Sequence, residues 1–124
     1  MFISSFFTFI FGEFDIVFKI LICLMIIDYF TGVMHAYYFK TVSSKIGFKG
    51  IIKKVATLSL VVLSSLMDYL IGNGFIIRSL VLFYLISNEG ISIVENISLI
   101  GVPVPEIIKK TLQKLKEGKK DGKL

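Results

Sequence analysis

Apolar residues fall into three long runs, and polar residues gather in the short stretches between and after them. The runs cover about residues 16–39, 51–71 and 75–100. Each run reaches the roughly 17 to 25 residues with which a helix crosses about 30 Å of hydrocarbon. The pattern therefore predicts an all-α integral membrane protein with a three-helix transmembrane domain over residues 16–102.

The segment before the first span has a different character. Five phenylalanines lie between Phe2 and Phe11, a stretch too short to cross the membrane alone. The polar residues Gly12 and Glu13 follow it. We expect residues 1–15 to form an interfacial or re-entrant helix. A longer first span that includes this segment is the main alternative.

A polar turn separates the second and third spans. It reads Gly72-Asn73-Gly74, and glycine accepts the positive φ angles of tight turns without steric cost. The two spans should therefore form an antiparallel hairpin.

The residues after the third span form a basic tail over 103–124. Pro103 and Pro105 should end the span, and from Glu106 onward apolar residues recur on one helical face and lysines on the other. Such an amphipathic helix can lie on anionic lipid of the inner leaflet. A solvated tail that only fixes topology is the alternative. The lysines expected to contact lipid are Lys109, Lys110, Lys114 and Lys116.

Composition and charge add a class and an orientation. Hydrophobic residues make up 55% of the 124 residues, and the mean hydropathy is +0.83, which argues against a soluble domain. The net charge is +5, and lysines concentrate in the connection at 40–54 and in the tail. Because lysine-rich short loops stay in the cytoplasm, we expect the C-terminus inside and the N-terminus outside.

Four acidic residues and one arginine lie within or at the ends of the apolar runs. A charge at the bilayer centre costs about 2.5 to 3.5 kcal/mol, so each needs a partner or water. Asp68 and Arg78 are equally far from the centre of the turn, and we predict a salt bridge between them. Glu95 lies near the inner end of the third span, and we predict that it pairs with Lys53 or Lys54. The five charged residues are Asp28, Asp68, Arg78, Glu89 and Glu95.

Asp28 and Glu89 lie towards the middle of their spans, where no basic partner is obvious. Asp28 belongs to a stripe of small and polar residues at helical spacing, and similar stripes lie on the other two spans, Ser64, Ser65 and Asp68 on the second and Asn88, Ser92 and Glu95 on the third. Such stripes pack membrane helices together, with protonated carboxyls sharing hydrogen bonds. The alternative is a face that water wets when subunits assemble. The residues of this proposed assembly or pore face are Asp28, Thr31, Gly32, His35, Ser64, Ser65, Asn88, Glu89 and Ser92.

The sequence offers little for catalysis or cofactor binding. It has no glycine-rich phosphate loop and no HExxH or GxSxG motif. Cys23 is the only cysteine, and His35 with Asp28 lacks a third metal ligand nearby. We therefore expect a protein that is not an enzyme and that takes no metal, cofactor, nucleic acid or small-molecule substrate.

Five short segments form an ordered set. They are DYFTG at 28–32, SSKIGFKG at 43–50, FYLISNE at 83–89, SIVEN at 92–96 and GVPVP at 101–105. Over about residues 16–116 this set resembles the toxin secretion/phage lysis holin family. The Phe-rich N-terminal segment matches no pattern of that family.

The resemblance implies a small phage or prophage protein that oligomerises in the bacterial cytoplasmic membrane and opens lesions at a set time. Such lesions release or activate a cell-wall endolysin, and holin-like proteins of clostridial toxin loci are implicated in the export of large toxins. No enzymatic activity or cofactor is implied. An antiholin or a docking subunit that acts through the basic tail is the alternative. A secondary transporter or proton channel is a third class, which the lack of inverted repeats weakens.

Overall fold

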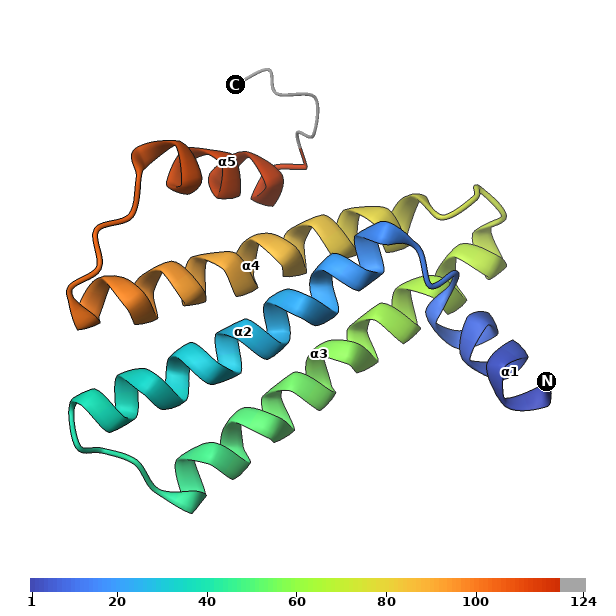
Figure 1. The fold of residues 1–124 in the computed structure, drawn as a ribbon. Coiled ribbons are helices and arrows are strands. Elements are labelled where there is room, and N and C mark those ends of the chain that lie inside the picture. The colour runs from blue at the N-terminus through green and yellow to red at the C-terminus, as the bar shows by residue number, and fades with distance from the viewer. Residues whose placement is uncertain (119–124) are drawn as a thin grey trace.

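The computed structural model describes residues 1–118, which form five helices (Figure 1). Three of the helices are long and apolar enough to cross a membrane, so the predicted all-α fold with three spans is confirmed. Residues 119–124, which include three of the tail lysines, lie outside the described part. The helices are α1 (Phe2–Phe11), α2 (Ile16–Tyr38), α3 (Ser44–Ile71), α4 (Ile76–Ile100) and α5 (Glu106–Lys116).

The second span is longer than the sequence pattern predicted. α3 begins at Ser44 rather than at residue 51, because the Ser43 side chain accepts a hydrogen bond from the Ile46 N–H and caps the helix. Lysines assigned to the connection therefore belong to the helix. As a consequence, Lys54 lies about 15 Å along α3 from its first residue, at 1.5 Å per residue.

The chain reverses direction between α3 and α4, which run antiparallel (Figure 1). Gly72 ends α3 with a φ of 76°, and Gly74 has a φ of 73°. These left-handed conformations favour glycine.

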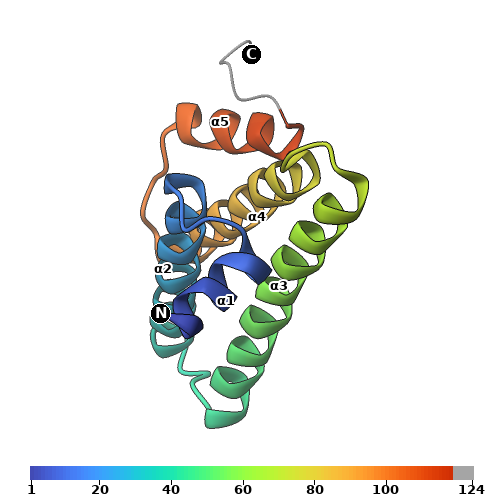
Figure 2. The ribbon, with the colours of Figure 1, turned by 90° about the vertical axis from the view of Figure 1, so that its right-hand side faces the viewer.

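α4 is the central helix of the bundle. It packs along α2 and contacts α3 and α5 as well, whereas α2 and α3 contact each other much less (Figures 1 and 2). The buried apolar core lies in the half of the bundle nearest the Gly72 turn. The core residues are Phe18, Leu21, Met25, Val61, Leu82, Leu85 and Ile86. Many other large apolar side chains point outward, as expected for helices in lipid.

The N-terminal helix is separate from the first span. Gly12, with a φ of 78°, ends α1, and α2 begins only at Ile16. The alternative of one longer first span is therefore wrong. α1 packs against α3, where the Phe9 and Tyr69 rings stack with their centroids 5.1 Å apart. The Tyr69 hydroxyl donates a hydrogen bond to the Phe9 carbonyl at 2.9 Å.

The tail helix α5 folds back along α4 (Figures 1 and 2). Gly90 makes room for it, since a Cβ at this position would lie 2.4 Å from Leu112 Cδ2. Leu112 and Leu115 are half-buried, whereas Lys109 and Lys110 are exposed. The structure thus places the basic helix beside α4 rather than beyond its end.

Candidate functional site: a charged cluster between the spans

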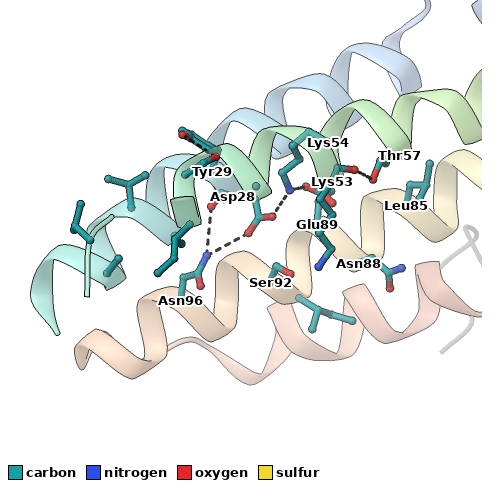
Figure 3. Close-up of a pocket in the computed structure, with 18 of the residues that line it drawn as sticks. Asp28, Tyr29, Lys53, Lys54, Thr57, Leu85, Asn88, Glu89, Ser92 and Asn96 are labelled. Carbon is teal, nitrogen blue, oxygen red and sulfur yellow. Dashed lines mark hydrogen bonds and ion pairs between the residues drawn. The ribbon is translucent and has the colours of Figure 1, made fainter. Parts of the chain in front are cut away.

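One charged residue from each span meets in the interior of the bundle. Lys54 Nζ on α3 donates hydrogen bonds to Asp28 Oδ2 on α2 and to Glu89 Oε1 on α4 (Figure 3). The side chains of Lys54, Asp28 and Glu89 are only 19%, 13% and 11% exposed. The expectation that Asp28 and Glu89 lack a basic partner at their depth is therefore wrong. We call these three residues the charged cluster.

An asparagine extends this cluster between α2 and α4. Asn96 Nδ2 donates to Asp28 Oδ1 at 3.2 Å and to Thr31 Oγ1 at 3.0 Å. The Thr31 hydroxyl in turn donates to the Asp28 carbonyl at 3.1 Å. Gly32 lies beside this amide, and a Cβ there would make an ordinary contact with Asn96 Nδ2 at 3.7 Å. Asp28 is thus held by groups from all three spans.

The predicted pair of Glu95 with Lys53 or Lys54 is wrong. Lys54 contacts Asp28 and Glu89 instead, while Glu95 is exposed on α4. The prediction started the second span too late and so placed Lys54 at the membrane edge. In addition, Glu95 lies six residues after Glu89, about 240° further around the helix, and therefore faces another direction.

A cavity of about 520 Å³ lies beside the charged cluster, between α2, α3 and α4. Its lining extends to Val42 and Ser43 in the α2–α3 connection, so it occupies the half of the bundle opposite the apolar core. Besides Ser43, the polar residues of the wall are all labelled in Figure 3: Asp28, Tyr29, Lys53, Lys54, Thr57, Asn88, Glu89, Ser92 and Asn96.

A tyrosine joins α2 to α3 beside this cavity. The Tyr29 hydroxyl donates to the Gly47 carbonyl at 3.4 Å. A Cβ on Gly47 would lie 3.2 Å from the Tyr29 hydroxyl, and one on Gly50 would lie 3.4 Å from the ring. Gly47 therefore lets the hydroxyl approach α3 closely, whereas a Cβ on Gly50 would make an ordinary contact with the ring.

The structure divides the predicted polar face into two groups. Asp28, Gly32, Asn88, Glu89 and Ser92 line the cavity, and Thr31 joins them through Asn96. The others lie elsewhere: Ser64 and Ser65 are buried on α3 nearer the Gly72 turn, and the His35 ring packs on Phe39. Ser65 Oγ has no hydrogen-bond partner among the described residues.

The predicted salt bridge between Asp68 and Arg78 is also wrong, although the two residues do meet. The Asp68 carboxylate accepts from the backbone N–H groups of Ile77 and Arg78, at 3.0 and 2.7 Å. Phe75, which precedes α4, offers no capping side chain. Asp68 therefore caps α4 from the neighbouring helix and satisfies N–H groups that have no partner within α4.

The Arg78 side chain instead holds the link between α1 and α2. Its Nε donates to the Phe11 carbonyl at 2.6 Å, one Nη donates to the Glu13 carbonyl at 2.7 Å, and the other donates to an Asp15 carboxylate oxygen at 3.1 Å. Gly12 is required here, since a Cβ would lie 2.4 Å from Arg78 Nε. We call this set of contacts the arginine clamp.

Sequence reasoning missed three participants in these sites. Asp15 and Asn96 received no role, and Lys54 received the wrong partner. A signal existed for Asn96, which lies seven residues after Glu89 and so falls close to the same face of the helix. The pairing of Asp15 with Arg78 joins residues 63 positions apart, and no local spacing indicates it.

Asp15 makes the arginine clamp sensitive to acid. Burial acts to raise the pKa of the Asp15 carboxyl, but hydrogen bonds from Arg78 and the Phe18 N–H, and the positive charge of Arg78, hold it below its usual 3.8. A carboxyl with a lowered pKa stabilises the fold above its unfolded pKa, and this contribution is lost as the pH falls through the lowered value.

We therefore expect α1 to stay attached at neutral pH and to loosen only below the usual Asp15 pKa of 3.8. Spin labels at Ser5 and Ser59, in a Cys23→Ser background in micelles, report the distance between α1 and α3. Asp15→Asn keeps a capping oxygen but removes the charge, so its distances should be broad at neutral pH and insensitive to acid. An identical acid transition in Asp15→Asn would contradict the assignment.

Comparison with known proteins identifies the family. A model of the bacteriophage holin family matches residues 5–117. The chain belongs to this family. An uncharacterised protein of Listeria monocytogenes is 41% identical over 106 residues, which cover 86% of this chain and 76% of the relative. A probable holin of Bacillus phage phi105 is 36% identical over 102 residues, which cover 82% of this chain and 74% of the phage protein.

A protein of Clostridium perfringens is also similar to the chain. It is an uncharacterised protein encoded in the nagH 3′ region, and it is 39% identical over 118 residues, which cover 94% of this chain and 89% of the relative. No solved structure matches the chain significantly. Family membership and the three spans make this holin-family protein a multi-pass protein of the cytoplasmic membrane.

Proposed function

We propose that this protein is a holin: it oligomerises in the bacterial cytoplasmic membrane and permeabilises it, which releases or activates an endolysin or lets a large toxin leave the cell. Family membership and similarity to a probable phage holin support the proposal. The observation that carries it is the charged cluster, because three charged side chains in the interior of a small three-span protein serve no purpose in lipid anchoring alone.

The cluster also suggests why a holin would act after a delay. In a single chain, Lys54 pairs with both Asp28 and Glu89, so the spans stay together at low density. A buried charge left without its partner costs about 3 to 5 kcal/mol, and this cost resists opening. At high density the polar faces can pair between copies, and water can then follow the charged groups across the membrane.

The orientation belongs to this proposal. The lysines at the start of α3 and the linker to α5 lie at the same end of the bundle (Figure 1), and the preference of lysines for the cytoplasm places this end inside. The N-terminus then lies outside.

The tail requires a rearrangement in the membrane. Lysines beside α4 would meet hydrocarbon, at about 2.5 to 3.5 kcal/mol each at the bilayer centre. We propose that α5 swings away from α4 on residues 101–105 and lays Lys109, Lys110, Lys114 and Lys116 on anionic inner-leaflet lipid.

Inducible expression in a bacterium tests the proposed function. With a potential-sensitive dye in the medium, we expect an abrupt loss of membrane potential after a delay, and lysis only when a cytoplasmic endolysin is co-expressed. The endolysin alone is the matched control. A steady potential during accumulation of the protein in the membrane would contradict the holin assignment and favour an antiholin or a docking subunit. A graded, ion-selective conductance would favour a transporter or channel.

A further inference from the structure

We infer that the cavity is a hydrated vestibule: a site for water and small hydrophilic ions inside a single chain, which ends at the charged cluster. The inference goes beyond permeabilisation, because it concerns the chain before any lesion opens. The existence of the vestibule requires only that the three spans lie in the membrane. The side of the membrane from which water enters depends on the proposed orientation.

The interior of the bundle is asymmetric along its length. The buried apolar residues, among them Leu21, Val61 and Leu82, fill the half nearest the Gly72 turn. The cavity occupies the opposite half, between α2 and α3 with α4 along its side, and reaches the α2–α3 connection. The charged cluster lies where these two halves meet, so polar solvent could reach it from one side only.

The cavity has the volume and lining that water needs. Its 520 Å³ is enough for on the order of ten to twenty water molecules at about 30 Å³ each. A buried water also needs two to four polar partners. The side chains of Lys53, Asn88 and Ser92 line the cavity, and among the described residues they have no hydrogen-bond partner. They offer donors and acceptors to solvent.

Lipid chains are a poor alternative occupant. Two carboxylates and two lysines contribute to the lining, and contact of charged groups with hydrocarbon costs several kcal/mol. Water would solvate the same groups and keep Lys54 charged between its two acids. The wall also contains apolar residues, among them Val33, Ile46 and Ile91.

The packed half explains why such a vestibule does not conduct. Leu21 and Val61 are fully buried, and Leu82 is 1% exposed, so side chains close the path beyond the cluster. A single chain then holds half of a water path, and permeabilisation requires only that the apolar half come apart.

Cysteine accessibility tests the vestibule in the full-length chain with Cys23→Ser. Ser92→Cys and Asn88→Cys place thiols in the cavity wall, Ser65→Cys places one in the packed half, and Ser59→Cys places one on the exposed face of α3 that meets lipid. The probe is a membrane-impermeant trimethylammonium methanethiosulfonate, applied to inverted membrane vesicles or to spheroplasts before any loss of potential. The thiolate attacks the reagent sulfur, a mixed disulfide forms and a sulfinate leaves.

Because the reagent needs a thiolate in water, we expect both cavity cysteines to react at least about tenfold faster than the two controls, in inverted vesicles only. Reaction of both cavity cysteines at the rate of Ser59→Cys would overturn the vestibule, as would equal reaction of Ser65→Cys. Fast reaction in spheroplasts only would support the vestibule and overturn the orientation. Membrane potential in the lysis assay is measured separately, so failure of the holin proposal would not affect this result.

Discussion

Replacing Lys54 by methionine is expected to lower the free energy of unfolding by about 3 to 5 kcal/mol, the usual cost of removing one partner from a buried ion pair. The methionine fills a similar volume but leaves Asp28 and Glu89 near each other without a positive charge (Figure 3). Both carboxyls are shielded from solvent, so the repulsion between them is weakly screened. Titration with a denaturing detergent, followed by circular dichroism in micelles, measures the change.

The neighbouring lysine provides a matched control for this prediction. Lys53→Met removes a lysine from the same helical turn, but Lys53 is exposed and is not paired with a carboxylate in the described part of the chain, so its loss should cost about 1 kcal/mol or less. Adding Asp28→Asn and Glu89→Gln to Lys54→Met should restore much of the stability, because neutral amides can share hydrogen bonds. Equal stability of Lys54→Met and Lys53→Met would show that the charged cluster does not stabilise the fold.

The sequence predicted the spans well because one physical requirement defines them. Every helix in lipid must be apolar over about 20 residues and must satisfy its own backbone groups, so the runs at 16–39 and 75–100 could be read directly. The start of α3 was harder to predict from the sequence. Ser43 caps a basic, amphipathic turn, which hydropathy does not separate from a polar loop.

The charged pairs could not be derived from depth alone. Counting residues from the turn placed Asp68 and Arg78 at one level, and there they do meet, but the contact uses the backbone N–H of Arg78 while its guanidinium turns to Asp15. Which side of a helix faces which neighbour depends on how each helix is rotated. Lys54 contacts both Asp28 and Glu89 because α3 is rotated so that this lysine points into the space between α2 and α4, and hydropathy does not determine that rotation.

The cavity and the position of the tail also depend on packing. The cavity exists because α2 and α3 touch little and approach through Tyr29 at Gly47 and Gly50. α5 returns along α4 because Gly90 leaves space for Leu112. Each of these contacts joins residues far apart in the chain, and one sequence taken alone offers no signal for such pairs.

Replacing Arg78 by methionine is expected to release α1 and to lower the free energy of unfolding by roughly 3 kcal/mol, because the change removes charge-assisted hydrogen bonds to three acceptors. Arg78 is 3% exposed, so water cannot readily replace these contacts. Its position in the first turn of α4 is unfavourable for a positive charge, and the Asp15 and Asp68 carboxylates offset this. Unfolding in micelles and the distance between spin labels at Ser5 and Ser59 measure both effects.

Two further variants separate the geometry of the arginine clamp from its charge. Arg78→Lys keeps the charge near Asp15, but an ammonium group cannot reach the Phe11 and Glu13 carbonyls in the directions of a guanidinium fork. We expect it to lose about half of the stability lost in Arg78→Met and to broaden the label distances. Lys19→Met is the control, because it removes an exposed lysine from the first turn of α2. The Lys19 Nζ lies 5.5 Å from the centroid of the Phe14 ring, and its loss should lower the free energy of unfolding by about 0.5 to 1 kcal/mol. If Arg78→Lys matched the wild type in both measurements, charge alone would hold α1, and the three-acceptor clamp would be wrong.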